Sequence, residues 1–224
     1  MTYTLHFGQV TPYIPYLAQG GLISLLIAFL AFAGGMVLGL LGAFGRSFGP
    51  PWVRRAVRAY VVFFTNTPQL VQIYFLFFVL PDAGILLSPF QAVWLGMTLN
   101  AGAYLTEIQR AGFASVPQGE LDAAETLGMS RAQCARLVIL PHVVRTMFAP
   151  LSNQYIIMVL GTSMAAVFGV EELTGRAFSV NAETFRSIEV FSITAALYVL
   201  VTLAATLLLA VLGRLMFRVR VQVL

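Results

Sequence analysis

Five long stretches of uncharged, mostly apolar residues limit what this chain can fold into. A helix needs about 20 predominantly apolar residues to cross the roughly 30 Å hydrocarbon core of a bilayer. Of the 224 residues, 59% are hydrophobic and only 10% are charged, whereas soluble domains average about 25% charged residues. We therefore expect an all-α integral membrane protein with five transmembrane helices. The predicted spans are approximately Leu22–Phe44, Tyr60–Leu80, Pro89–Thr106, Met147–Val170 and Val190–Leu212.

The arginines predict how these spans are oriented. Cytoplasmic loops of membrane proteins carry an excess of basic residues. Two arginines, Arg176 and Arg186, lie in the fourth connection. The other eleven lie in the first connection, in the third connection or after the last span: Arg46, Arg54, Arg55, Arg58, Arg110, Arg131, Arg136, Arg145, Arg214, Arg218 and Arg220. The distribution predicts an outside N-terminus, a cytoplasmic C-terminus and a multi-pass protein of the cell inner (plasma) membrane.

The same features predict the domain organisation. The first 19 residues contain prolines and interfacial aromatics such as Tyr13 and Tyr16, so residues 1–19 are expected to lie along the outer membrane surface. No basic residue precedes Arg46, so the first apolar stretch is expected to remain as a span and not to be cleaved. Residues 20–220 are expected to form a single transmembrane domain that includes a cytoplasmic loop, residues 112–141.

Several classes of function are disfavoured by composition. One cysteine, Cys134, cannot form an intrachain disulfide, and two histidines, His6 and His142, give no plausible metal cluster. The basic residues follow membrane topology instead of clustering on a soluble face, so no nucleic-acid partner is expected. An intramembrane hydrolase would need a nucleophile beside a histidine base, and both histidines lie at span margins. We expect no catalytic residue, no metal and no cofactor in this chain.

The third connection has the pattern of two short helices. Leu121, Ala124 and Leu127 recur at helical spacing. Gly128 is a typical helix stop, and Pro117 with Gly119 is expected to end the helix before it. Ser130 and Gln133 form the pattern of a capping box that starts a second helix, predicted to end at Pro141. The connection is therefore predicted to be a compact cytoplasmic unit with an exposed tip.

This connection resembles the EAA loop of ABC importer permeases. The family pattern is E-A-A, three residues, Gly, nine residues and I-x-L-P. Asp122-Ala123-Ala124, Gly128 and Val138-Ile139-Leu140-Pro141 follow that spacing. Asp122 replaces the usual Glu, and Val138 replaces the usual Ile.

Other segments resemble the polar amino acid (histidine/glutamine/arginine-type) branch of that family. Phe63–Gln72 is similar to F-F-R-x-T-P-x-L-V-Q, Ala103–Arg110 to A-Y-x-x-E-I-x-R, and Ser115–Gly119 to S-V-P-x-G. The branch commonly has K-D-T-S-L in the fourth span, where this chain has Leu160-Gly161-Thr162-Ser163-Met164. The substitution removes a Lys and an Asp from that segment.

The resemblance implies the MetI-like permease fold and a role as the membrane subunit of an ATP-driven importer for polar amino acids. It implies two ABC ATPase subunits that bind ATP and Mg, since this chain lacks the phosphate-binding G-x-x-x-x-G-K-[ST] motif. It also implies a second permease, identical or related, and a periplasmic or lipid-anchored amino-acid-binding protein. An ion-coupled secondary transporter of small polar solutes is the alternative, and it leaves the EAA spacing unexplained.

The coupling residues follow from this resemblance. The short helix is expected to dock in a cleft of the ATPase; the alternative is an amphipathic helix lying on lipid headgroups. The residues predicted to couple are Glu120, Leu121, Asp122, Ala123, Ala124, Glu125, Leu127 and Gly128.

Polar residues inside the spans are the predicted substrate pathway. Pro68 removes a backbone hydrogen bond within the second span, and freed carbonyls there must face protein or water. The alternatives are structural: a kinked helix bonded to its neighbours, an ion pair of Glu107 with Arg110, and close helix packing at Thr162 and Ser163. The predicted pathway residues are Asn66, Thr67, Gln69, Gln72, Asn100, Tyr104, Glu107, Thr162 and Ser163, with Asn153 and Gln154 as weaker candidates. The external segment Glu171–Glu189 is either a docking surface for the binding protein or a solvated loop.

Overall fold

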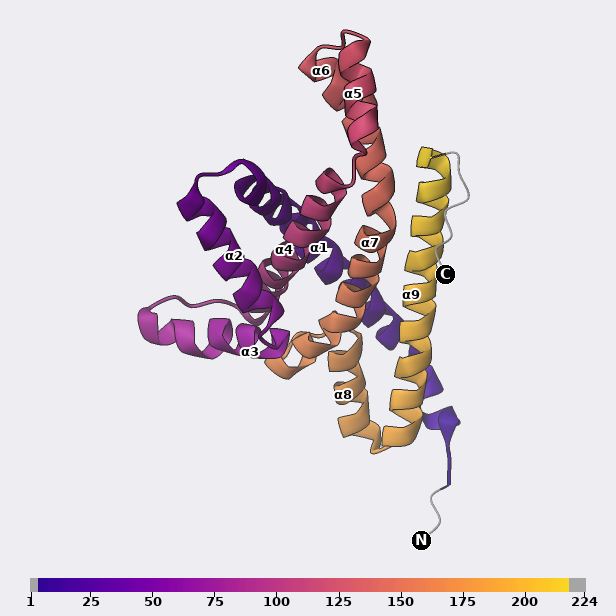
Figure 1. Ribbon diagram of the computed structural model, residues 1–224. Helices are drawn as coiled ribbons and strands as arrows, with labels where there is room; N and C mark the ends of the chain where they lie inside the picture. The colour runs from indigo at the N-terminus through magenta and orange to yellow at the C-terminus, as the bar shows by residue number, and fades with distance from the viewer. Residues whose placement is uncertain (1–3, 218–224) are drawn as a thin grey trace.

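The computed structural model describes residues 4–217, which are helical with short connections and contain no strand (Figure 1). Two short 3-10 turns, Phe7–Gln9 and Thr11–Tyr13, lead into helix α1, Ile14–Phe48. Arg218 and Arg220, used in the prediction of orientation, lie outside the described residues.

Helices α1 and α4 form the centre of the molecule and make the most extensive contact between any two described elements. Helix α4, Pro89–Ala114, begins at a capping box between Ser88 and Gln91. Glycines on α1 allow the two backbones to approach closely. A Cβ atom added to Gly39 would lie 2.8 Å from Cβ of Leu105, so only glycine fits at that point of the contact.

The predicted second span is broken. Helix α2, Pro51–Thr65, ends before Pro68, and helix α3, Gln69–Tyr74, starts after it. A π-helical turn, Phe75–Val79, and a 3-10 turn, Leu80–Ala83, continue α3. The two arms differ in direction by 105°. The predicted second span over Tyr60–Leu80 is therefore not one straight helix but is broken at Pro68, because proline cannot continue the hydrogen-bond ladder of α2.

The third connection contains α5, Gln118–Thr126, and α6, Arg131–Cys134. A π-helical turn, Ala135–Ile139, joins α6 directly to α7, Leu140–Gly161, which ends in a 3-10 turn, Thr162–Phe168. The second helix of the loop thus continues through Pro141, and the predicted end there is wrong. Pro141 lies in the first turn of α7, where a missing amide hydrogen is tolerated, and the preceding π turn accommodates the ring. Gly119 likewise lies within α5 and does not end α4.

Two further helices complete the chain. Helix α8, Leu173–Thr184, makes up most of the segment Glu171–Glu189. Helix α9, Ser187–Phe217, runs beside α7 (Figure 1). Phe185 joins α8 to α9 in a left-handed conformation, with φ of 55°, and its side chain is exposed.

Three described helical stretches are long and apolar enough to cross a membrane: Phe7–Phe48, Arg131–Phe168 and Ser187–Phe217. The count becomes four when α2 and the α3 arm are taken as one broken span. Helix α4 is not among them. It is flanked by α1, α2, α3 and α7, so polar side chains such as Asn100 and Gln109 are buried against protein and do not face lipid.

Candidate functional site

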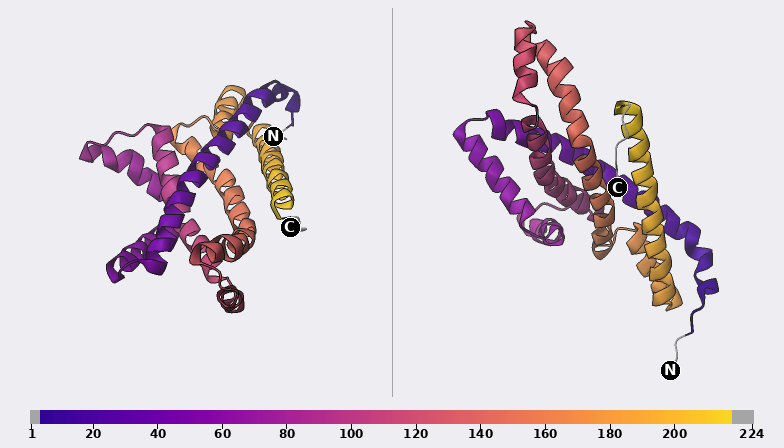
Figure 2. Two further views of the ribbon diagram at one scale, coloured as in Figure 1. Left: turned by 90° about the horizontal axis from the view of Figure 1, so that it is seen from above. Right: turned by 45° about the vertical axis from the view of Figure 1, so that its right-hand side comes forward.

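The α5–α6 unit stands beyond the ends of the other helices (Figures 1 and 2). Its turn is built as the sequence predicts. Gly128 has φ of +69°, and the amide of Met129 donates to the carbonyl of Ala124 at 3.1 Å, which closes the end of α5. The hydroxyl of Ser130 and the side chain of Gln133 form a reciprocal capping box at the start of α6.

Most of the predicted coupling residues are exposed on this unit. Ala124 is 3% exposed and packs inward, and Leu121 is half-buried. Leu127 is 79% exposed, although it is a large apolar side chain at the tip. The other exposed members are Glu120, Asp122, Ala123, Glu125 and Gly128. The unit therefore presents a mixed acidic and apolar surface away from the helix bundle.

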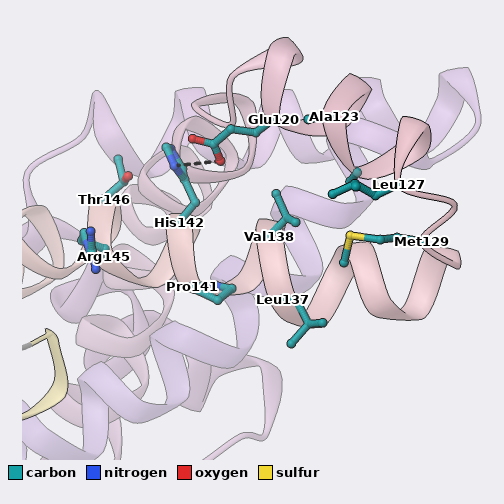
Figure 3. Close-up of a pocket in the computed structure, with 11 residues that line it drawn as sticks. Glu120, Ala123, Leu127, Met129, Leu137, Val138, Pro141, His142, Arg145 and Thr146 are labelled. Atoms are coloured by element: carbon teal, nitrogen blue, oxygen red, sulfur yellow. Dashed lines mark ion pairs between the residues drawn. The ribbon is translucent and has the colours of Figure 1, made fainter.

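A hollow of about 580 Å³ lies between α5 and the start of α7 (Figure 3). Nδ1 of His142 lies 3.8 Å from a carboxylate oxygen of Glu120 across this hollow. The aliphatic side chains of Leu137 and Val138 and the guanidinium of Arg145 also line it. His142, which the sequence analysis placed only at a span margin, thus connects Glu120, the first of the predicted coupling residues, to α7.

The break between α2 and α3 is held by side-chain amides. The amide nitrogen of Gln72 donates to the carbonyl of Phe64 at 3.0 Å and to the carbonyl of Thr67 at 3.1 Å. The amide nitrogen of Asn100, on α4, donates to the same Phe64 carbonyl and to Oε1 of Gln72, both at 3.1 Å. These contacts match the kinked-helix alternative, in which the polar groups bond to neighbouring helices.

A cavity of about 340 Å³ lies between this break, α4 and α7. It brings together four of the predicted pathway residues, Thr67, Gln69, Asn100 and Tyr104, with Gln154 from α7. Its apolar lining was not predicted and consists of Pro68, Met97, Ile157 and Met158. No local pattern distinguishes these methionines from ordinary packing residues. Only the way the helices pack brings them to the cavity.

The remaining predicted pathway residues do not line this cavity. Glu107 is held by Arg46 of α1 and by Arg110, whose Nη2 lies 2.9 Å from the carboxylate. The sequence predicted the Arg110 pair but not Arg46. Thr162 and Ser163 donate to carbonyls of their own helix, those of Val159 and Leu160, at 2.7 and 2.9 Å. The side-chain amide of Asn66 donates to the Val62 carbonyl at 2.8 Å. The side chain of Gln72 accepts from Asn100 and does not line the cavity.

The sequence analysis did not predict that a carboxylate in the fourth connection is buried and holds helices together. Glu172 is fully buried and accepts hydrogen bonds from Ser24, Tyr198 and the amide of Gly175, at 3.0, 2.8 and 2.9 Å. It therefore joins α1, α8 and α9. Glu189, also fully buried, accepts from the amide of His6 at 2.8 Å. Both carboxylates lie among the charged residues that the sequence suggested as a docking surface or a solvated loop.

Comparison with known proteins agrees with this architecture. Residues 35–219 match the family described as "Binding-protein-dependent transport system inner membrane component". The chain is 38% identical over 210 residues to the glutamine transport system permease protein of Escherichia coli (strain K12), covering 93% of this chain and 96% of the relative. It is 36% identical over 193 residues to the octopine transport system permease protein of Rhizobium radiobacter, covering 82% of this chain and 79% of the relative.

Solved structures give the same result. The chain superposes with a TM-score of 0.87 and 30% identity on a chain from the crystal structure of an amino acid ABC transporter with histidines, covering 95% of this chain and 99% of that one. An inward-facing structure of the MetNI methionine ABC transporter matches with a TM-score of 0.71 at 19% identity, over 92% of this chain and 98% of that one, which supports the fold. The chain has the all-helical MetI-like permease fold, and it belongs to the family of binding-protein-dependent transport system inner membrane components, as an amino-acid ABC importer permease.

Proposed function

We propose that this permease forms half of a two-subunit translocation pathway that is opened and closed by two ABC ATPase subunits. The second permease is a copy of this chain or a related one. ATP and Mg bind to the ATPase subunits, and a periplasmic or lipid-anchored binding protein delivers a polar amino acid. The family, the relatives and the fold give no support to the ion-coupled secondary transporter.

The membrane arrangement that we propose has five crossings, with α4 as the central one. The N-terminus and α8 are external, and the C-terminus and residues 112–141 are cytoplasmic. The arginine distribution supports this orientation. Residues 1–19 are proposed to lie on the outer surface, and residues 20–220 to form the single transmembrane domain.

The observation that carries the proposed coupling is the position of α5. It projects beyond the bundle (Figure 2). Acidic and apolar side chains at its tip are exposed. After the turn at Gly128, α6 and the π turn continue without interruption into α7, and α7 lines the polar cavity. Residues Glu120 to Gly128 would dock on the ATPase, so that a movement of the docked tip is transmitted along α7 to the pathway.

The pathway that we propose passes through the cavity between the α2–α3 break, α4 and α7. Gln69, Asn100, Tyr104 and Thr67 would contact cargo there. Asn66, Gln72, Glu107, Thr162 and Ser163 were predicted to line the same pathway, and their contacts within the chain support positioning roles.

Co-purification with the cognate ATPase subunit tests the coupling proposal. Leu127→Asn removes the exposed apolar side chain at the tip and should weaken retention of the ATPase by about tenfold, since a few apolar anchors carry most of an interface's affinity. Leu86→Asn is the matched control, because Leu86 is 82% exposed and lies outside the coupling loop. Equal retention of the ATPase by both variants would contradict docking through α5.

A further inference from the structure

The polar cavity contains side-chain amide groups that are not fully paired with other described residues. Within residues 4–217, the side chains of Gln69 and Gln154 have no hydrogen-bond partner. Asn100 is 8% exposed and donates through its nitrogen, while its Oδ1 accepts from no described residue. Gln69 and Gln154 are half-buried, so their amides are accessible within the cavity. Amide groups that converge on one cavity and are not paired with other described residues are available to bind a polar ligand.

The cavity is also electrically neutral. Among the described residues that line it, none carries a formal charge, and Tyr104 is the only titratable one. The nearest charged residue along α4 is Glu107, about 4.5 Å further along the helix axis. Glu107 is already paired with two arginines, Arg46 and Arg110, so this cluster carries one net positive charge. It offers no free carboxylate to a cationic ligand.

We infer that this cavity selects amino acids whose side chain is polar but uncharged, an inference that rests on the proposed pathway. An amide group contains both hydrogen-bond donors and acceptors. Gln69 and Gln154 can therefore donate to the α-carboxylate of a zwitterion and accept from its α-ammonium group. The ring of Tyr104 can face the ammonium group. A volume of about 340 Å³ is within the range of small-molecule sites.

A charged side chain on the cargo would remain unpaired in this site. The two charges of a zwitterion are close together and offset one another, whereas a third charge needs a counter-charge once water is removed. A cationic side chain finds no carboxylate in the wall and meets the positive Arg46–Glu107–Arg110 cluster nearby. An anionic side chain finds no arginine in the wall, and both arginines of the nearby cluster are already bound to Glu107. Both classes are therefore rejected relative to an uncharged polar side chain.

Gly161 provides a direct way to change this selectivity. A Cβ atom added there would lie 3.6 Å from Oε1 of Gln69, an ordinary contact distance, and would meet no other described atom within 4 Å outside its own turn of helix. The backbone of Gly161 has φ of −63°, which any residue adopts. Gly161→Asp therefore adds a carboxylate beside Gln69 without backbone strain. Gly161→Asn adds a group of the same shape without the charge.

The test is equilibrium dialysis of the purified permease–ATPase complex with radiolabelled L-glutamine, L-arginine and L-glutamate, without the external binding protein. Wild type should bind glutamine at least about tenfold more tightly than either charged amino acid. Gly161→Asp should raise the affinity for arginine relative to glutamine by about tenfold, and Gly161→Asn should leave the ratio as in wild type.

Three results would overturn the inference: equal or tighter binding of arginine or glutamate by wild type, no binding of any of the three, or the same ratio in both Gly161 variants. Failure of the broader proposal is recognised separately, because the permease would then not co-purify with the ATPase. A complex that forms and hydrolyses ATP but binds charged cargo as well as glutamine refutes only the selectivity.

Discussion

The side-chain amide of Gln72 supplies the hydrogen-bond donor that the backbone of Pro68 lacks. Proline has no amide hydrogen, so the carbonyl four residues earlier, that of Phe64, loses its donor. Gln72 and Asn100 both donate to that carbonyl, at 3.0 and 3.1 Å. Because an unpaired carbonyl is costly in a membrane protein, these two side chains allow the chain to bend sharply beside the cavity.

Gln72→Leu should therefore destabilise the protein. The change leaves carbonyls of the break with fewer donors, which we expect to lower the free energy of unfolding by about 1–3 kcal/mol. Thermal unfolding of the detergent-solubilised permease measures the effect. Gln69→Leu is the control, because Gln69 lies beside Pro68 but has no described hydrogen-bond partner. A Gln69 variant that unfolds as early as the Gln72 variant would refute the explanation.

Gly128 makes the turn after α5 through its positive φ of +69°. A Cβ atom there would meet no atom within 4 Å, so the cost of Gly128→Ala comes from the backbone alone, about 1 kcal/mol. Gly128→Asn should cost less, since asparagine tolerates this conformation. Hydrogen exchange of the α5 amides should be faster in the Ala variant than in the Asn variant. The reverse order would contradict a left-handed turn.

At the scale of single elements, the α1–α4 contact determines where the cavity-lining face of α4 lies. The contact requires glycine on α1, since a Cβ on Gly39 would also lie 2.9 Å from the backbone carbon of Leu105. Close backbone approach at small residues is a common way for membrane helices to pack.

Gly39→Leu should separate α1 from α4 and lower thermal stability by about 1–3 kcal/mol. Gly119→Ala is the matched control. Gly119 lies inside α5 with nothing within 4 Å of its Cβ position, and alanine favours helix. We expect that variant to be as stable as wild type or slightly more stable. A Gly39→Leu protein with an unchanged melting temperature would show that the two helices do not pack at this point.

Whether a structural feature could be predicted depends on how far apart in the sequence the residues that determine it lie. Gly128 and the Ser130–Gln133 capping box were predicted correctly, because turns and caps depend on neighbouring residues. The passage of the helix through Pro141 was not, because it depends on a π turn with no clear sequence signal. The pairing of Gln72 with Asn100 spans 28 residues and arises only when α3 packs on α4.

The all-helical permease fold was predicted correctly, whereas the five spans and their orientation remain predictions. The cavity was predicted only in part. Amides and hydroxyls within apolar stretches identified Thr67, Gln69, Asn100 and Tyr104, and the structure brings them together. Arg46 was assigned only to topology, since nothing near it in the sequence indicates that it reaches Glu107 of another helix. Buried Glu172 was missed because its neighbours in sequence are a mixture of charged residues that suggests solvent exposure.

At the scale of the whole molecule, the proposed topology places α5 and the α8–α9 turn on opposite sides of the membrane. Single cysteines at Leu127 and at Phe185, in a Cys134→Ser background, test this. A membrane-impermeant thiol reagent added outside intact cells should label the cysteine at 185 and not the one at 127. Inverted membrane vesicles should give the opposite labelling. Labelling of both positions from the same side would contradict five crossings with an external N-terminus.

ATP-driven uptake into proteoliposomes tests the central claim most directly. The permease would be reconstituted with its ATPase and binding protein, and uptake of a mixture of radiolabelled amino acids would be followed. The account predicts accumulation only with Mg-ATP on the side of α5, and none with a non-hydrolysable ATP analogue. Accumulation driven by an imposed sodium or proton gradient without ATP would contradict it.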